Sequence, residues 1–157
     1  MYKRQPQDTA FTEEEVRKFF WYSATITNES DRMGIRLERE EPLHHIKDGN
    51  ILTDGVAFGS IQVPTNGQVI IMMADRQTTG GYTKIGTVIS VDLPKLAQAQ
   101  PGFRVHFVRV GIQLAQELYL RQLKELKNLE RYLGQRSCRT LPPHSGRHKD
   151  GKEENEA

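Results

Sequence analysis

The fold is decided by the stretch Gly55–Asp92, GVAFGSIQVPTNGQVIIMMADRQTTGGYTKIGTVISVD. Three runs in it are rich in β-branched residues, which suit a pleated, half-buried surface, and they predict strands at Gly59–Val63, Gln68–Met73 and Ile85–Ser90. Between the first two, Pro64-Thr65-Asn66-Gly67 predicts a turn, because Pro presets φ and Gly takes a positive φ without strain. These two strands should therefore form a hairpin.

The third strand is reached through Ala74–Lys84, a polar segment with a Gly pair, which predicts a long loop. Gly80-Gly81 would let backbone N–H groups approach a ligand and form an anion-binding nest. The alternative is a structural hairpin loop in which Asp75 and Arg76 satisfy each other. A Walker motif is excluded, because no helix with a Lys-Ser/Thr pair opens after Gly81.

Outside this stretch the pattern predicts a mainly β fold with flanking helices. Thr12–Tyr22 predicts a helix, with Thr12 as N-cap and Glu15 completing a capping box. Alternation predicts strands at Ser23–Asn28 and Met33–Glu38, and Ile46–Thr53 reads as a turn-bearing connection. A helical turn at Leu93–Ala99, a closing strand at Arg104–Arg109 and a long helix at Gly111–Leu133 complete the expected elements.

Composition indicates one soluble domain. The 157 residues are 27% charged, and no apolar run approaches the ~20 residues that span a bilayer. The net charge of +2, spread among acids, argues against nucleic acid as a partner. The single Cys138 excludes an internal disulfide and fits a reducing compartment, so we expect a cytoplasmic protein.

Four segments, SDRMGIRL (Ser30–Leu37), GSIQVP (Gly59–Pro64), ADRQTTGGY (Ala74–Tyr82) and AQAQPG (Ala97–Gly102), resemble the biotin-dependent carboxyltransferase-like family in order and spacing. That family includes the C subunit of 5-oxoprolinase, allophanate hydrolase subunit 2, the antagonist of the sporulation kinase inhibitor, and part of the carboxyltransferase region of urea carboxylase. Its members are longer, so the resemblance covers their C-terminal half and implies a cyclophilin-like β-barrel.

The resemblance, together with the apolar periodicity and composition of the C-terminal residues, predicts the domain organisation. Residues 6–110 would form the carboxyltransferase-family domain, residues 111–133 a C-terminal helix packed on its own domain or on a partner, and residues 134–157 a disordered tail. The first five residues, MYKRQ, match the translation of a common sequencing adaptor. The natural start, together with an N-terminal half of the protein, is therefore expected upstream.

Candidate site residues fall in the family-like segments. Asp75 and Arg76 are the candidate catalytic residues, with Asp75 a general base if it is buried. Gln62, on an expected edge strand before Pro64, can donate and accept at once, which suits an amide, ureido or lactam group. The candidate substrate-binding residues are Arg32, Arg36, Gln62, Gln77, Thr78, Thr79, Gly80, Gly81 and Tyr82.

Several alternatives stay open. Arg32 and Arg36 either offer a planar fork to a carboxylate or phosphate, or pair loosely with nearby acids on the surface. Gln62 either reads a ligand or satisfies a neighbouring loop. No metal site is expected, because His44 and His45 would point to opposite faces of an extended chain, and Cys138, His144 and His148 lie in a polar tail.

Two functions compete at this stage. The resemblance implies a component of an ATP-dependent amidohydrolase system, most simply the C subunit of 5-oxoprolinase or allophanate hydrolase subunit 2. It would act with a second protein resembling the kinase inhibitor or the B subunit of 5-oxoprolinase, and ATP would bind in the assembled complex. The alternative is a non-catalytic module that holds a partner protein or kinase inhibitor. No residue pattern distinguishes 5-oxoproline, allophanate and urea as substrates.

Overall fold

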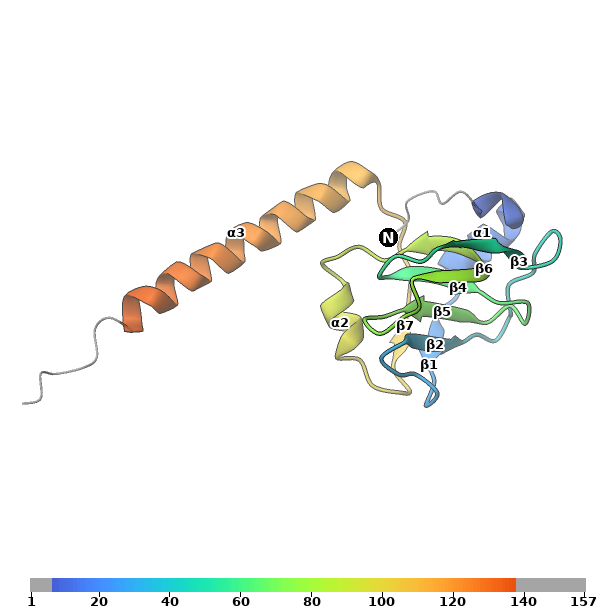
Figure 1. Cartoon of the computed structure of the whole chain (residues 1–157), viewed down its shortest axis with the longest axis horizontal. Helices are drawn as coiled ribbons and strands as arrows, with labels where there is room; N and C mark the ends of the chain where they lie inside the picture. The colour runs from blue at the N-terminus through green and yellow to red at the C-terminus, as the bar shows by residue number, and fades with distance from the viewer. Residues whose placement is uncertain (1–6, 138–157) are drawn as a thin grey trace, which may run out of the picture. The chain divides into compact units, whose positions relative to one another are not determined.

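The computed structural model of the protein describes residues 7–137. A mainly antiparallel β-sheet with flanking helices, including a long C-terminal helix, confirms the expected fold class (Figure 1). The elements in chain order are η1 (Asp8–Ala10), α1 (Glu13–Trp21), β1 (Ala24–Ile26), β2 (Gly34–Glu38), β3 (Asn50–Gly55), β4 (Ser60–Val63), β5 (Val69–Met72), β6 (Thr79–Thr87), α2 (Leu93–Ala97), β7 (Arg104–Val105) and α3 (Ile112–Ser137).

The seven strands follow the order β3-β6-β4-β5-β2-β1-β7. Each strand pairs with its neighbours in antiparallel fashion, and Figure 1 shows the central strands side by side. The predicted hairpin is confirmed, since β4 pairs with β5 across the turn. Gly67 has a φ of 74°, and its N–H donates to the Pro64 carbonyl at 2.9 Å. A side chain there would collide with the Leu43 backbone, 2.4 Å from an added Cβ.

The core lies on one face of the sheet, because alternate residues of the central strands point the same way. Phe19 from α1 is fully buried and stacks on Phe107, with ring centroids 4.6 Å apart. Burying such apolar side chains is the main stabilising term in a domain of this size. The strand residues that share this core are Ile35, Leu37, Ile61, Val63, Val69, Ile71 and Ile85.

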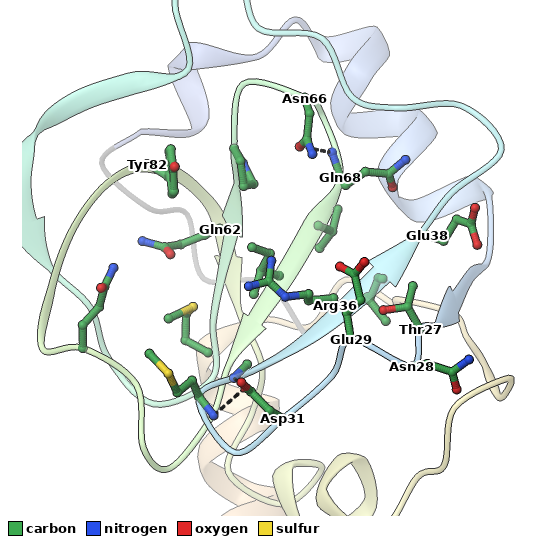
Figure 2. Close-up of a pocket in the computed structure, with 18 residues that line it drawn as sticks. Thr27, Asn28, Glu29, Asp31, Arg36, Glu38, Gln62, Asn66, Gln68 and Tyr82 are labelled. Carbon is green, nitrogen blue, oxygen red and sulfur yellow. Dashed lines mark hydrogen bonds between the residues drawn. The ribbon is translucent and has the colours of Figure 1, made fainter.

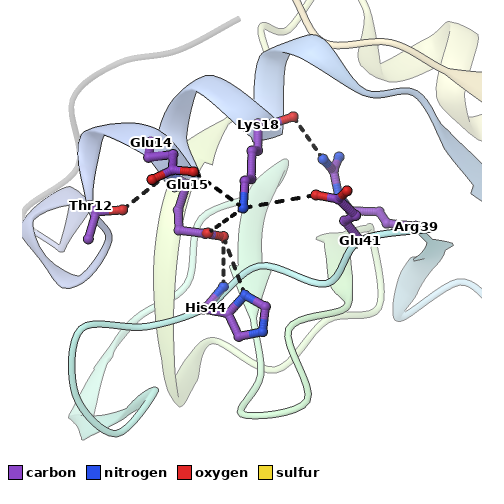
Figure 3. A network of polar contacts seen from close by, with 7 residues as sticks. All are labelled: Thr12, Glu14, Glu15, Lys18, Arg39, Glu41 and His44. Atoms are coloured by element: carbon purple, nitrogen blue, oxygen red, sulfur yellow. Dashed lines mark hydrogen bonds and ion pairs between the residues drawn. The ribbon is translucent and has the colours of Figure 1, made fainter.

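The expected helix at the N-terminus is confirmed. Thr12 is its N-cap, and its hydroxyl accepts from the Glu15 N–H at 3.2 Å. The Glu15 carboxylate is itself buried and accepts from the His44 N–H at 2.9 Å and from the Lys18 ammonium at 3.2 Å (Figure 3). Burial raises the pKa of Glu15, but these hydrogen bonds outweigh it and the pKa is lowered. Glu15 therefore joins α1 to the loop before β3.

Arg39 secures the other end of α1. Its guanidinium, in a side chain that is 4% exposed, donates to the Lys18 carbonyl at 2.9 Å and to the Tyr22 carbonyl at 3.4 Å. The Tyr22 carbonyl is one that a helix leaves unsatisfied at its C-terminus, whereas the Lys18 carbonyl already accepts the Tyr22 N–H at 3.1 Å and gains a second donor. The guanidinium also lies 5.7 Å from the centroid of the Phe19 ring. A residue that would ordinarily be exposed thus acts as a buried helix cap.

Two segments predicted as connections are strands in the structure. Thr79–Lys84, predicted as part of a loop, belongs to the long strand β6, and Ile46–Thr53, predicted as a connection, runs into the strand β3. The pairing of these two strands was not visible locally, because Asn50 and Tyr82 are partners across more than thirty positions of sequence. Gly80 and Gly81 therefore belong to the part of β6 that pairs with β3, and not to a nest.

The end of the chain also differs. The strand expected at Arg104–Arg109 is confined to Arg104–Val105 and pairs with β1, so β7 and β3 stand at opposite ends of the strand order in the described chain. The long helix is confirmed but ends at Ser137, beyond the expected Leu133. It crosses the boundary at Gln122 between the two compact units of the chain.

Some expectations lie outside the described residues. These are the disordered tail after Ser137 and the absence of a metal site at Cys138, His144 and His148. Among the helices of residues 7–137, none is long and apolar enough to cross a membrane.

Candidate functional site

A pocket of about 730 Å³ lies over the sheet on the face opposite the core (Figure 2). Strands β2, β4 and β5 form its floor, and the β1–β2 connection forms one wall. Its size is in the range of sites for small molecules. The lining residues are Thr27, Asn28, Glu29, Asp31, Met33, Gly34, Arg36, Leu37, Glu38, Gln62, Pro64, Asn66, Gln68, Val69, Ile70, Met72, Gln77 and Tyr82.

The sheet register places polar residues in one row across the floor. Gln62 of β4 is opposite Ile70 of β5, and Ile70 is opposite Arg36 of β2. The Thr27 N–H donates to the Arg36 carbonyl at 3.0 Å, which continues the row to the end of β1. Directly opposed residues share a face of a sheet, so these side chains all belong to the pocket face.

Gln62 is the most unusual member of this row. Its side chain is 2% exposed, and its amide nitrogen Nε2 has no hydrogen-bond partner in the described structure. A buried donor without a partner costs roughly 1–3 kcal/mol, so such groups point to a missing ligand or solvent molecule. Because β4 is a central strand between β6 and β5, the expectation of an edge strand at Gln62 was wrong.

Gly80 makes the room for this amide. A Cβ atom at Gly80 would lie 2.8 Å from Gln62 Nε2 and 3.2 Å from Gln77 Nε2. Gly81 is different, since the nearest atom to an added Cβ is the Ile51 carbonyl oxygen at 3.4 Å, an ordinary contact. Neither glycine has a positive φ, so the expected backbone role of the pair is replaced by a steric role of Gly80.

Arg36 is the cation of the pocket. Its exposed guanidinium makes no hydrogen bond or ion pair with any described residue, although Ser30 anchors its backbone through a 3.0 Å bond from Arg36 N–H to Oγ. Figure 2 shows Arg36 between Gln62 on one side and Glu29 and Thr27 on the other. Arg36 is thus placed to meet a ligand anion, which needs a planar donor fork of this kind.

Arg32, which the resemblance favoured over Arg36, lies outside the pocket lining. Its Nε donates to Asp75 Oδ2 at 2.7 Å and its Nη2 to Oδ1 at 3.1 Å, a bidentate pair. The hydrogen bond with Asp75 raises the pKa of Arg32. The Asp75 side chain is 49% exposed, so the burial that a general base would need is absent. A catalytic role for Asp75 stays a prediction without geometric support.

Arg76 holds the loop before β6 in place. Its Nε donates to the Val56 carbonyl at 3.0 Å and its Nη1 to the Met73 carbonyl at 3.3 Å. The guanidinium also lies 5.6 Å from the centroid of the Phe58 ring, within the range of a cation–π contact. Its donors therefore serve the backbone. Arg76 is not among the residues that line the pocket.

Of the remaining candidates, Gln77 and Tyr82 line the pocket, whereas Thr78 contributes its carbonyl to the Val56 N–H at 2.8 Å and Thr79 begins β6. The sequence interpretation missed several polar lining residues, namely Thr27, Glu29, Glu38, Asn66 and Gln68. The period of two in β2 could have found Glu38, because it shares a face with Arg36. Of the pocket-lining residues that the structure describes, Thr27 also has a buried side-chain atom, its hydroxyl oxygen, without a hydrogen-bond partner.

Cofactor chemistry finds little support in this pocket. The pocket is lined by three carboxylates, those of Glu29, Asp31 and Glu38, and by one cation, Arg36. This excess of negative charge does not fit a nucleoside triphosphate. Within residues 7–137, no group of three His, Cys, Asp or Glu side chains gathers as metal ligands would. His45 instead has its Nε2 2.8 Å from Thr83 Oγ1, and burial lowers the pKa of its ring.

Comparison with known proteins gives a consistent picture. Residues 3–109 match the family model described as carboxyltransferase domain, subdomain A and B. The chain is 41% identical over 122 residues to the C subunit of 5-oxoprolinase from Haemophilus influenzae, covering 69% of this chain and 38% of that protein. It is 38% identical over 121 residues to the C subunit of 5-oxoprolinase from Escherichia coli, covering 76% of this chain and 36% of that protein. The chain thus spans less than half the length of these relatives.

Solved structures show the same fold. The Kluyveromyces lactis urea carboxylase superposes with a TM-score of 0.74 at 24% identity, covering 82% of this chain and 12% of that chain. The urea amidolyase of the same yeast gives the same TM-score of 0.74 and identity of 24%, and the match covers 8% of that chain. At this identity the likeness concerns the fold alone.

Proposed function

Since this chain belongs to the carboxyltransferase domain family, subdomain A and B, we propose that it is the substrate-binding part of an amidohydrolase of the 5-oxoprolinase type. Its pocket binds a small lactam or amide that carries a carboxylate, with 5-oxoproline the first candidate. Both bacterial relatives, named as 5-oxoprolinase components, support this choice over allophanate. The work of the whole assembly, including its use of ATP and a second protein, is part of the same proposal.

The observation that carries the proposal is the unpartnered amide of Gln62. Its Nε2 is a buried donor in the pocket wall, and a lactam or amide carbonyl is the acceptor that would satisfy it. Arg36, across the row, offers a free guanidinium for the carboxylate of the same ligand. A site built to hydrogen-bond a substrate group discriminates strongly against analogues that lack the group.

The chemistry itself is assigned to the assembled system. The only acid among the expected catalytic residues, Asp75, is exposed and paired with Arg32 outside the pocket lining. The described lining contains no Ser, Cys or Lys nucleophile, and its one Thr hydroxyl, that of Thr27, has no base bonded to it. The second candidate function is a non-catalytic module that holds a partner protein. The missing nucleophile would favour it only if the pocket also failed to bind a small ligand.

Titration calorimetry with two probes tests the proposal. L-5-oxoproline has both a lactam and a carboxylate, whereas 2-pyrrolidinone has the lactam alone. Arg36→Ala should weaken L-5-oxoproline by about tenfold or more and leave 2-pyrrolidinone unchanged, while Gln62→Leu should weaken both. Arg17→Ala, which removes a cation of α1 outside the pocket, is the matched control. Equal affinity of wild type and both pocket variants for L-5-oxoproline would refute the assignment.

A further inference from the structure

The pocket contains more charge than a lactam carboxylate needs. Besides Arg36, the carboxylates of Glu29 and Glu38 line it, and neither has a hydrogen bond or ion pair with another described residue. Asp31 differs, because its Oδ1 already accepts the N–H groups of Met33 and Gly34 at 2.8 and 2.9 Å. Among the described residues, the pocket thus has two carboxylates and one guanidinium that lack a partner, on β2 and on the β1–β2 connection.

The backbone sets the spacing of these groups. Arg36 and Glu38 are two residues apart on β2, so they share a face and lie roughly 6.6 Å apart at their Cα atoms. Gln62 lies two strands from Arg36 in the same row, at roughly 9.5 Å. Figure 2 shows Glu29 next to Arg36, on the side away from Gln62. The order along the pocket is thus a carbonyl-binding donor, an anion-binding cation, and two cation-binding carboxylates.

This order matches an open-chain α-amino acid better than a lactam. In an α-amino acid the carboxylate and the ammonium are on one carbon, so neighbouring cation and anion groups can hold both at once. A side chain ending in a carbonyl would then extend toward the buried amide of Gln62. In a lactam the nitrogen is neutral and bonded within the ring, so Glu29 and Glu38 would face no charge.

We propose that the pocket binds open-chain α-amino acids whose side chain ends in an amide or carboxyl group. The ammonium would lie between Glu29 and Glu38, the α-carboxylate at Arg36 and the side-chain carbonyl at Gln62. The inference rests on the proposed function, because it uses the same amide and carboxylate subsites. The inference adds a subsite for the ammonium group. The pocket would therefore prefer the open-chain amino acid, whose nitrogen is a free ammonium, over the closed lactam.

The test compares two molecules that differ in the ammonium alone. L-glutamine has the amide, the carboxylate and the ammonium, whereas glutaramate has the first two without the third. Calorimetry on the full chain should find L-glutamine at least about fivefold tighter than glutaramate, as expected for an ammonium beside two partly exposed carboxylates. The double variant Glu29→Gln/Glu38→Gln should bring the two affinities together without weakening glutaramate.

The control is the double variant Glu13→Gln/Glu40→Gln, which also removes two negative charges but from positions outside the pocket lining. It should keep the difference in affinity between L-glutamine and glutaramate. Equal binding of L-glutamine and glutaramate to the wild-type chain overturns the inference. If that result comes with Arg36-dependent binding of L-5-oxoproline, the ammonium subsite fails and the proposed function stands. If L-glutamine, glutaramate and L-5-oxoproline all fail to bind, both fail together.

Discussion

At the scale of single residues, the site depends on a side chain that is buried at a cost. Leaving an amide donor unpaired in a protein interior costs about as much as one good hydrogen bond contributes. Gln62 bears this cost because its strand is central and its Nε2 has no acceptor within residues 7–137. Gly80 on β6 and Arg36 on β2 owe their importance to their position relative to it.

The two neighbouring glycines of β6 should respond differently to substitution. Gly80→Ala would place a Cβ 2.8 Å from Gln62 Nε2, so the amide must turn and L-5-oxoproline should bind about tenfold more weakly. Gly81→Ala meets only an ordinary 3.4 Å contact and should bind normally. Calorimetry and thermal melts on the pair decide this. Identical ligand affinities in the two variants would contradict the steric role of Gly80.

Arg76 should matter for stability and not for ligand binding. Arg76→Ala removes charge-assisted hydrogen bonds to the Val56 and Met73 carbonyls, which should lower the free energy of unfolding by about 1–3 kcal/mol. Arg32→Ala removes an exposed pair with Asp75 and should cost at most about 1 kcal/mol. Urea unfolding curves measure both. An Arg76→Ala chain with unchanged stability and weakened L-5-oxoproline binding would instead assign Arg76 to the ligand site.

At the scale of elements, an ion pair joins the edge strand β3 to the sheet. Lys84 of β6 has a side chain that is 3% exposed, and its ammonium donates to Asp54 Oδ2 at 2.6 Å and to the Gly55 carbonyl at 2.9 Å. Gln7 adds a 2.8 Å hydrogen bond from its amide to the same Asp54 oxygen. An edge strand with few buried side chains is therefore secured largely by polar contacts.

This pair predicts a pH dependence of stability. The Lys84 hydrogen bond, followed by that of Gln7, lowers the pKa of Asp54 from 3.8 to about 2. Because the folded pKa is depressed, the stabilisation is complete above pH 3.8 and is lost as the pH falls toward 2. In Asp54→Asn, the melting temperature should no longer fall through the titration of this carboxylate. It should also be lower at neutral pH, because the buried Lys84 ammonium loses its carboxylate partner.

Thermal melts between about pH 2 and pH 6 would show this, with Glu40→Gln as the control because Glu40 is exposed. A wild-type chain and an Asp54→Asn chain with parallel melting profiles over that range would rule out a stabilising role for the pair.

At the scale of the whole molecule, the chain carries a binding pocket without an evident catalytic pair. It spans 38% and 36% of the lengths of its two bacterial 5-oxoprolinase relatives. The pocket's acidic balance also does not suit a nucleotide. Binding and turnover are therefore expected to separate when the chain is studied by itself.

We accordingly expect the purified chain to bind L-5-oxoproline but not to hydrolyse it. Incubation with L-5-oxoproline and ATP should release neither glutamate nor ADP above the level of a protein-free control, because no complete catalytic constellation lines the pocket. Chromatographic detection of glutamate is the direct measurement. Steady glutamate release, abolished by Arg36→Ala, would show that this chain includes the catalytic residues.

Local features of the fold were determined by the sequence alone. The turn at Pro64–Gly67, the helix after Thr12 and the strand Gly34–Glu38 follow from backbone preferences and side-chain alternation, which operate over a few neighbouring residues. The same reasoning gave Gln62 as a candidate amide-binding residue and Arg36 as one of three candidate arginines, with Arg32 and Arg76. It could not place them in one pocket.

Only the tertiary structure decided which candidates meet. Arg32 and Arg36 belong to the same family-like segment. Asp75 pairs with Arg32 because the connection after β5 folds back onto the β1–β2 turn, whereas the Arg36 guanidinium has no partner among residues 7–137. The sequence predicted a loop at Gly80-Gly81, whereas the structure places both glycines in β6, which pairs with β3. The isolation of the Gln62 amide depends on how β4 packs between β5 and β6, and a pattern that covers a few neighbouring residues does not encode contacts between strands.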